Sequence, residues 1–486
     1  MYYLLVLKIR RQKFDFQSIK NYILQLLIGL ANTQPIKPFK PRIRNLAIKL
    51  KLFSFPVSNF TSEHDGEEFE SIILLENIIS QEFEPNKRSA HDAISTDLER
   101  HIKNIVNKGP SVVVFAHDNF TKNIGGIQTV MHLENKAISE VSGNYWSIHP
   151  TKSREFFVFA PELELLHNGK FIAHIQTENV GKLLKILEEI VLGKSEQFLV
   201  VLHSLLGHDP EKVSSALQTL KTRNVYFYLH DFYSICPSFK LLRNNLEFCH
   251  APKVTSTSCK VCIYGNTRTI HINRIESILT LPEITFLAPS QSTRDIWTAS
   301  SEITGKAVIA PHLRLTSLAA RGGKVNPRPR IAFFGLPRKE KGWNSFLSLF
   351  AMLNKTHDFV VFSTQDPGIS GVTFNLLKND SGEIHQTRDI LIENRIDYAF
   401  IFPTWPETYS LVTAEAIAAG VFVLTNSHSG NVASLIEEFN SGAVFESLDL
   451  VVDFLTLNVE TNLNLQIYDV EFVGIVSQFV KVEIHG

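Results

Sequence analysis

A chain of 486 residues exceeds what one hydrophobic core usually supports, so two large domains with an extension are expected. With 44% hydrophobic and 20% charged residues, the composition is that of an ordinary soluble protein of enzyme size. With a formal net charge of −1, the overall charge of the chain does not indicate a charged binding partner. No nucleic-acid partner is expected.

The first 105 residues are expected to form an extension in which charge is segregated. Residues 1–60 contain eleven Lys or Arg and one acid, Asp15, whereas residues 61–100 contain eleven acids and three bases. Two interpretations stay open for the basic segment: it folds against its acidic neighbour, or it binds an anionic surface.

Two apolar runs, 1–7 and 22–31, bear on the location of the protein. The first is too short for the core of a signal peptide, and the second is about half a membrane span. We therefore expect a cytoplasmic protein rather than a secreted one. The basic residues around both runs fit a segment that lies on the inner face of a membrane rather than one that crosses it, so contact of residues 1–60 with an anionic membrane surface is one interpretation. A purely structural role is the alternative.

Residues 106–318 are expected to form a first α/β domain. Helix-length amphipathic stretches alternate with short β-branched or aromatic runs, which is typical of a parallel sheet covered by helices. The predicted strands of this domain are 111–118, 155–162, 198–204, 225–231 and 284–290.

All four cysteines of the chain lie in one predicted loop of this domain, residues 236–262. They are Cys236, Cys249, Cys259 and Cys262. Four thiols so close, in a chain without a secretory signal, are typical of a structural zinc site rather than of disulfides. The irregular spacing favours the alternative, a loop of free or partly buried thiols.

A segment rich in Gly, Pro and Arg, residues 319–330, is a predicted linker, after which the alternation restarts in a second α/β domain, residues 331–455. Its predicted strands are 330–335, 357–364, 372–377, 398–403 and 421–426. Residues 456–486 are expected to be a C-terminal tail. Two such domains leave a cleft between them, and ligands of parallel sheets bind beyond the carboxyl ends of the strands.

A helix predicted to start near Tyr409 places a carboxylate among apolar residues. The helical period puts Leu411, Glu415 and Ala418 on one stripe, so Glu415 is expected to be largely buried. A buried carboxylate is costly unless hydrogen bonds reach it, and a ligand with paired hydroxyls can donate them. The alternative is that a neighbouring backbone amide or arginine does so.

Five segments, in this order, resemble the motifs of retaining glycosyltransferases of the GT-B fold (glycosyltransferase group 1, family 4-like). They are HDNFTKNIGGIQTV (117–130), VYFYLHDFYSICP (225–237), FFGLPRKEKGW (333–343), PTWPETYSLVTAEAIAAG (403–420) and SGNVASLIEE (429–438). The fourth segment contains the E-x(7)-E spacing of that family. The resemblance covers roughly residues 111 to 450 and implies two Rossmann-like domains that face each other across a cleft.

The resemblance also implies an activity and a set of site residues. The enzyme would transfer a sugar from a nucleotide-diphosphate donor to a glycan or lipid-linked acceptor with retained configuration, most often in surface polysaccharide biosynthesis. The implied catalytic residues are His230 and Glu407. The implied donor-binding residues are Gly125, Gly126, Arg338, Lys341, Ser410 and Glu415. The chain contains no Asp-x-Asp pair, so a metal-independent reaction without a catalytic cofactor is expected.

The implied roles suit these residue types. Cations such as Lys341 neutralise a leaving diphosphate, and glycines at a strand-to-helix turn allow close approach of a phosphate or sugar. Glu415 would hold the ribose hydroxyls and Glu407 the hydroxyls of the donor sugar. Among the strand-end histidines, His230 matches the donor-contacting histidine of the family. Weaker candidates at neighbouring strand ends are His203, His117 and Asp118.

Two positions depart from the family pattern. Leu336 stands where an arginine is expected, with Arg338 as the nearest replacement, and Ser410 stands in place of glycine. These departures keep open a catalytically silent scaffold or a glycan-binding module. A sugar-nucleotide epimerase also shares the two-domain fold, but it would need further carboxylates and histidines in the cleft.

Overall fold

The computed structural model describes most of the chain after the first 93 residues. The described residues are 94–151, 159–194, 197–221, 224–300, 307–321, 326–377, 386–457 and 465–484. The predicted membrane contact at residues 1–60 lies outside these ranges. Within them, no helix is both long and apolar enough to cross a membrane.

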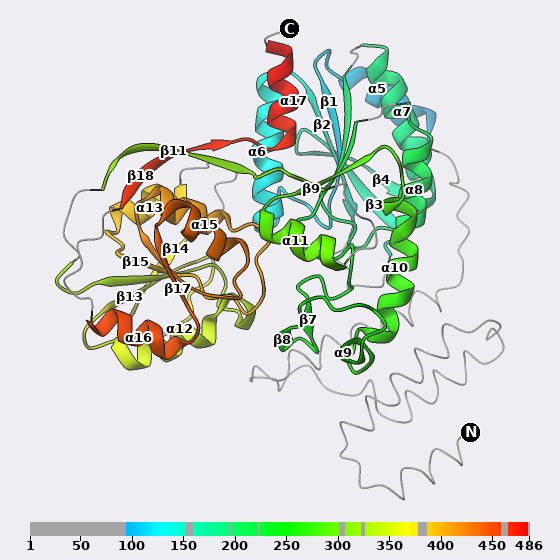
Figure 1. Ribbon diagram of the computed structural model, residues 1–486. Coiled ribbons are helices and arrows are strands. Elements are labelled where there is room, and N and C mark those ends of the chain that lie inside the picture. The colour runs from blue at the N-terminus through cyan, green and yellow to red at the C-terminus, as the bar shows by residue number, and fades with distance from the viewer. Residues whose placement is uncertain are drawn as a thin grey trace, which may run out of the picture. The chain divides into compact units, whose positions relative to one another are not determined.

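The first half of the described chain is built on an eight-stranded sheet with the order β10-β9-β6-β5-β1-β2-β3-β4 (Figure 1). Its strands are β1 (Ser111–Phe115), β2 (Asn144–Pro150), β3 (Glu162–His167), β4 (Lys170–Gln176), β5 (Phe198–Leu202), β6 (Val225–Tyr228), β9 (Ile284–Ala288) and β10 (Ala307–Ile309). The strands from β10 to β2 run parallel, whereas β3 and β4 are antiparallel additions.

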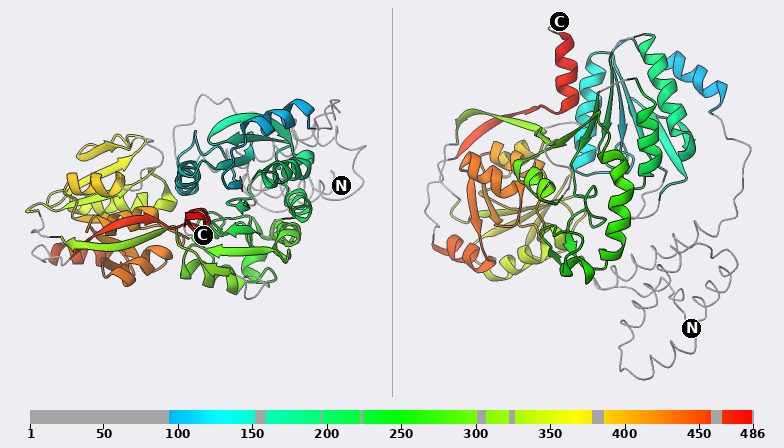
Figure 2. Two further views of the ribbon diagram at one scale, coloured as in Figure 1. Left: turned by 90° about the horizontal axis from the view of Figure 1, so that it is seen from above. Right: turned by 45° about the vertical axis from the view of Figure 1, so that its right-hand side comes forward.

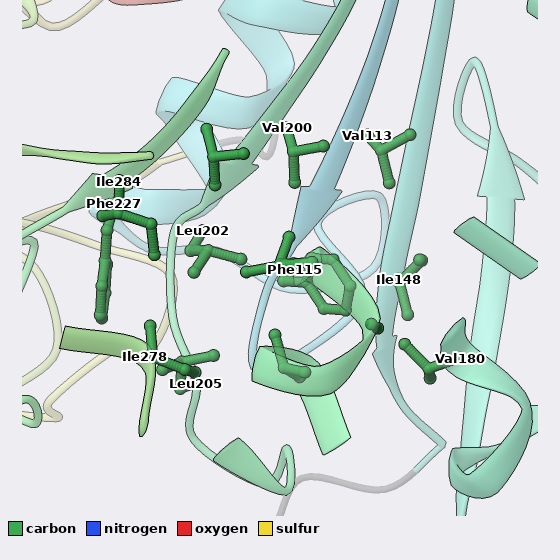
Figure 3. Close-up of a cluster of buried hydrophobic side chains, with 14 of the residues drawn as sticks. Val113, Phe115, Ile148, Val180, Val200, Leu202, Leu205, Phe227, Ile278 and Ile284 are labelled. Carbon is green, nitrogen blue, oxygen red and sulfur yellow. The ribbon is translucent and has the colours of Figure 1, made fainter. Parts of the chain in front are cut away.

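Helices cover both faces of this sheet, because its central strands are apolar on both sides. Every residue of β1 and of β5 is buried. Val113 and Phe115 point to the face covered by α7 (Val180–Leu192), α8 (Pro210–Gln218) and α10 (Gly265–Leu279), as Figure 3 shows in part. Val112 and Val114 point to the opposite face, which α6 (Gly126–Glu140) covers. This period of two is the ordinary alternation of a strand.

The predicted strands at 111–118, 198–204, 225–231 and 284–290 contain β1, β5, β6 and β9. The first half of the strand predicted at 155–162, residues 155–158, lies outside the described ranges, and Glu162 at its end begins β3. Four strands of this sheet were not predicted: β2, β4, β10 and all of β3 beyond Glu162. In β2 the apolar run is interrupted by buried polar residues, Asn144, Ser147 and His149, which hide the strand pattern.

The second half is a six-stranded, fully parallel sheet with the order β14-β13-β12-β15-β16-β17. Its strands are β12 (Arg330–Phe334), β13 (Asp358–Ser363), β14 (Val372–Leu376), β15 (Tyr398–Phe400), β16 (Phe422–Asn426) and β17 (Gly442–Phe445). Its helices are α12 (Trp343–Leu353), α13 (Gln386–Glu393), α14 (Leu411–Ala418), α15 (Asn431–Phe439) and α16 (Leu448–Leu457), and they lie on both faces (Figures 1 and 2).

The remaining elements are short or join the two halves. They are α5 (Thr96–Ile105), η2 (Thr177–Asn179), β7 (Leu242–Arg243), β8 (Glu247–Phe248), α9 (Thr257–Lys260), α11 (Gln291–Ser300), β11 (Leu313–Ala320), η3 (Lys339–Lys341), β18 (Gln466–Phe472) and α17 (Ile475–Ile484).

The structure differs from the predicted linker and tail. Strand β11 extends into the predicted linker and pairs antiparallel with β18, which lies in the predicted tail. The chain then returns to the first half, where Val476 and Val480 of α17 pack with Met131 of α6 (Figure 1). Burial of these apolar side chains stabilises the returning segment, and single-segment patterns do not reveal that partner.

The expected fold class, two Rossmann-like α/β domains, is confirmed by the two sheets. Each is doubly wound, because the chain leaves its starting strand in one direction and later returns to build in the other. In the first sheet this switch lies between β1 and β5, and in the second between β12 and β15. Ligands of such sheets bind at the carboxyl ends of the strands that flank the switch.

Candidate functional site

The loop that carries Glu407 follows β15 and is fastened to the loop after β16. Glu407 N donates to Ser429 O at 3.1 Å, and Asn431 N donates to Glu407 O at 2.9 Å. Gly430 makes this approach possible: its φ is +65°, and a Cβ there would lie 2.7 Å from Glu407 O. Only glycine fits such a conformation and such a contact without strain.

Lys341 and Glu407 form an ion pair at the switch point of the second sheet. The distance from Lys341 Nζ to Glu407 Oε1 is 2.7 Å, with the lysine side chain 45% exposed and the carboxylate 10%. Lys341 ends η3, directly after β12, and the following Gly342 has a φ of +84°. A Cβ on Gly342 would lie 2.2 Å from Phe402 O, so this glycine holds the η3 loop against the end of β15.

Arg338 and Lys240, two further cations near η3, are arranged differently from Lys341. Arg338 is exposed, and its side chain makes no hydrogen bond in the part of the chain that the structure describes. Lys240, from the first half of the chain, pairs with Glu340 of η3 at 2.5 Å. Lys240 was not among the predicted site residues, because nothing in its local sequence indicates a partner one hundred residues away.

Thr408, the neighbour of Glu407, joins the second half to the first through three hydrogen bonds. Its hydroxyl donates to His230 O at 2.5 Å. Its carbonyl accepts from Ser290 Oγ at 2.8 Å and from Thr293 Oγ1 at 2.9 Å. Thr408 therefore connects the two predicted catalytic residues: its hydroxyl bonds the backbone of His230, and Glu407 precedes it in the chain.

His230 follows β6 and lies in a group of aromatic rings. Its Nε2 lies 2.8 Å from His203 Nδ1, and its ring stacks on Tyr228 and on His312. Burial, reinforced by His312 and His203, holds the pKa of His230 well below its usual range, so the ring is neutral. Burial also lowers the pKa of His312, to about 3.

The loop after β1 meets the beginning of α6. Gln128 Nε2 donates to Asp118 Oδ1 at 2.7 Å and lies 3.3 Å from His117 Nε2. Gly125 is the N-cap of α6 with extended backbone, and a Cβ on Gly126 would meet no atom within 4 Å. Gly126 therefore leaves open space at the start of this helix, whereas a Cβ on Gly125 would lie 2.4 Å from Gln128 Oε1.

Ser410 is the N-cap of α14, as its residue type predicts. Its Oγ accepts from Thr413 N at 3.3 Å, and its own N–H donates to Asn431 Oδ1 at 3.1 Å. Asn431 thus contacts both the Glu407 segment and the start of α14, although the sequence analysis assigned it no role.

Glu415 lies on α14 between the buried residues Ala414 and Ala416. Its side chain is partly rather than fully buried, and the hydroxyl of Thr387 on α13 hydrogen-bonds to it. Burial raises the pKa of Glu415 to about 8, against which the Thr387 bond acts. Thr387 therefore meets part of the need that the sequence analysis assigned to a ligand, an amide or an arginine.

The four cysteines line one small cavity of about 20 Å³, together with the buried Arg268. Arg268 Nη1 donates to Cys259 Sγ at 2.9 Å, while its Nη2 has no partner among the described residues. Burial raises the pKa of the Cys236 thiol to about 12. As the side chains stand, no three His, Cys, Asp or Glu residues in the described ranges are grouped so that they could hold a metal ion.

Sequence reasoning missed Glu134, a fully buried residue of α6 that contacts His203 and Tyr145. The signal was present: Val130, Glu134 and Ile138 recur every four residues, so a carboxylate interrupts a buried helical stripe there as at Glu415.

Comparisons with known proteins give limited information. No protein-family model matches the chain, and a search of curated proteins finds no match. Among solved structures it is similar to a sucrose-phosphate synthase from Thermosynechococcus elongatus, with 12% identity and a TM-score of 0.46 over 77% of this chain and 94% of that one. It is also similar to Anabaena HepE in complex with UDP-glucose, with 10% identity and a TM-score of 0.45 over 77% of this chain and 94% of that one. An α,α-trehalose-phosphate synthase from Burkholderia vietnamiensis has 10% identity and a TM-score of 0.41 over 78% of this chain and 94% of its own. Likenesses of this size carry no argument about activity.

Proposed function

We propose that this chain is a retaining glycosyltransferase that moves a sugar from a nucleotide-diphosphate donor to a glycan or lipid-linked acceptor, in surface polysaccharide biosynthesis. The observation that carries the proposal is the Lys341–Glu407 pair at 2.7 Å, at the switch point of a doubly wound sheet. A half-exposed cation beside a nearly buried carboxylate suits a ligand that presents a diphosphate and sugar hydroxyls side by side.

The reaction requires stabilisation of the charge that develops on the leaving diphosphate. Lys341 can supply it as a cation whose position is fixed by Gly342 and by the pair with Glu407. The start of α14, with Ser410 as its N-cap, adds backbone N–H groups and the positive end of a helix dipole. Arg338 is free to reach the same group, in place of the family arginine that Leu336 replaces.

The two glutamates receive different parts of the donor in this proposal. Glu407, fastened through Gly430 and paired with Lys341, faces the sugar hydroxyls. Glu415 binds the ribose, where a hydroxyl pair can replace or join the hydroxyl of Thr387 as a donor to the carboxylate.

His230 contacts the donor sugar as a neutral ring in this proposal. Its low pKa supports a hydrogen bond to a sugar hydroxyl rather than an electrostatic contact with the diphosphate. The bond from the Thr408 hydroxyl to the backbone carbonyl of His230 holds the His230 segment beside the Glu407 loop, so both groups can be presented to one ligand.

The experiment that tests this function is a screen of sugar nucleotides, followed by measurement of nucleoside diphosphate release. A true donor should raise the melting temperature of the protein, and diphosphate release should increase when a suitable acceptor is added. Binding of a sugar nucleotide with no diphosphate released, with or without a panel of glycan and lipid-linked acceptors, would favour the silent scaffold. Interconversion of the sugar nucleotide with its epimer would favour the epimerase.

A further inference from the structure

A buried carboxylate in the first half of the chain is connected to the proposed catalytic residue His230 through one intervening histidine. Glu134 of α6 is fully inaccessible to solvent. Its Oε2 accepts from Tyr145 OH at 2.9 Å and lies 2.9 Å from His203 Nε2, while Oε1 has no partner among the described residues. Burial, with the charge of Glu134 next, raises the pKa of Tyr145 well above its usual range, so the phenol keeps its proton and donates.

The contacts continue from this carboxylate to the proposed catalytic histidine. His203 Nδ1 lies 2.8 Å from His230 Nε2. Glu134, His203 and His230 thus form one continuous line of hydrogen bonds from the interior of the domain to the end of β6. His203 follows β5 and His230 follows β6, and these strands are paired neighbours in the sheet.

The number of hydrogens on each group fixes the direction of this line. A carboxylate oxygen accepts this bond, so Nε2 of His203 carries the hydrogen. With Nδ1 of His203 as the acceptor between the rings, the hydrogen of that bond belongs to His230 Nε2. Since neutral imidazole carries a single ring hydrogen, His230 Nδ1 is left as an acceptor.

We propose that Glu134 is a positioning residue that acts through His203 to hold His230 in the Nε2–H tautomer, with Nδ1 ready to accept a hydrogen bond from a hydroxyl of the bound sugar. This role rests on the proposed function for its ligand, but the tautomer itself does not. It also accounts for Glu134, because a buried carboxylate with one unpartnered oxygen is costly and the packing of α6 alone would favour an apolar residue.

The test is nitrogen NMR of protein labelled with ¹⁵N-histidine, with His230 assigned by comparison with His230→Gln. In the wild-type chain, the shifts of His230 should be those of an Nε2–H ring. Glu134→Leu removes the acceptor for the Nε2 hydrogen of His203, so neither ring is held in one tautomer, and the shifts of His230 should move toward those of a mixture of the Nε2–H and Nδ1–H forms. An Nδ1–H ring in the wild type, or a tautomer unchanged by the substitution, would overturn the proposal. The wild-type spectrum decides even if the variant does not fold.

Kinetics with an identified donor form the second arm. Glu134→Leu should lower kcat/KM by about 10-fold, the typical worth of one hydrogen bond to a ligand. Tyr145→Phe is the matched control, because it removes the other bond to the same carboxylate oxygen and leaves the line to His230 intact. It should keep the wild-type tautomer and kcat/KM within about 3-fold. An equal loss in both variants would show that the effect is general destabilisation. If neither the wild type nor the variants transfer sugar, but the His230 tautomer is the expected one in each, the proposed function fails and the positioning by Glu134 stands.

Discussion

At the scale of single residues, burial makes ionisation of Glu415 unfavourable, and the hydrogen bond from Thr387 compensates for this only in part. Burial raises its pKa to about 8 from an ordinary 4.5, and the hydroxyl of Thr387 opposes that shift without cancelling it. Near neutral pH the ligand-free chain therefore holds this carboxyl mostly protonated. Donor binding would have to draw the proton off, which is consistent with a ligand that brings its own hydroxyl donors.

The raised pKa predicts how stability depends on pH. The folded state holds the Glu415 proton more tightly than the unfolded state, so the unfolding free energy falls as pH rises from the unfolded pKa of 4.5 to the folded pKa of about 8. Glu415→Gln does not titrate and should escape this loss. Its stability relative to wild type should increase by at least about 1 kcal/mol across that range, since each pKa unit is worth about 1.4 kcal/mol. Urea unfolding at several pH values measures the difference, and a constant difference would show that Glu415 has an ordinary pKa.

Gly430 gives a second prediction, about the position of Glu407. Gly430→Ala places a Cβ 2.7 Å from Glu407 O at a φ of +65°, so the Glu407 loop must shift. We expect kcat to fall by at least about 10-fold, because small displacements of catalytic groups are costly. Steady-state kinetics with an identified donor measure this.

Gly368→Ala is the control for this prediction. Gly368 also has a positive φ, +67°, but a Cβ there meets no atom within 4 Å, so an alanine is strained in its backbone without a collision. It should lose about 1 kcal/mol of stability and keep full activity. Wild-type kcat in Gly430→Ala would mean that the loop tolerates the shift, and that Gly430 does not position Glu407.

At the scale of elements, the sequence predicted strands where apolar runs are continuous and failed where polar side chains interrupt them. β5 is apolar throughout, and β1 and β12 are apolar after their first residues, because both faces of these strands are buried. In β2 the side chain of Asn144 is inside and hydrogen-bonds Ser111 Oγ of β1, a contact that no single strand pattern reveals.

Some residues of the candidate site could likewise be predicted from local sequence, and others could not. Lys341 and Glu407 could be predicted because each follows a recognisable strand within a short motif. Thr408 and Lys240 could not, because their importance lies in contacts with His230 and Glu340, which are far away in the sequence. The roles assigned to the site residues stay predictions.

Zinc binding by the four cysteines stays a prediction. The cavity adds one detail to it, the position of Arg268 beside the thiols. The thiols line one cavity beside Arg268, whose guanidinium can offset the negative charge of a tetrathiolate zinc site. Zinc binding requires the thiols to approach one another, because no metal-holding group is formed as they stand among the described residues. We expect about one zinc per chain in elemental analysis of purified protein, with thiols that react only after chelation. A metal-free protein whose four thiols are all unreactive would contradict this.

At the scale of the whole molecule, the two halves are connected by more than the chain between β10 and β12. Thr408 bonds His230, Lys240 pairs with Glu340, and the N–H of Ile475 donates to Tyr228 OH at 3.0 Å. These bonds join segments far apart in the sequence, and the bond of Ile475 holds part of the predicted tail against the first half of the chain. Contacts between residues so far apart in the sequence cannot be predicted from the pattern of a single short segment.

The basic residues 1–60 predict a dependence on membrane charge. If this segment lies on a cytoplasmic leaflet, each Lys or Arg contributes about 1 kcal/mol near anionic lipid, and binding should weaken as salt is raised. Sedimentation with anionic and with neutral vesicles, for the full chain and for one lacking residues 1–93, measures this. Equal sedimentation of both chains with anionic vesicles would contradict it.

The most direct measurement of the central claim compares donor kinetics of Glu407→Gln and Glu415→Gln with the wild type. Glu407, paired with Lys341, is proposed to act where charge develops, so its variant should lower kcat by at least about 10-fold with less effect on donor KM. Glu415 is proposed to hold the ribose alike in ground and transition states, so its variant should raise donor KM more than it lowers kcat. Gln keeps the shape of Glu, so both variants should fold. Wild-type kinetics in both variants, with a verified donor, would contradict the assignment of this site to sugar transfer.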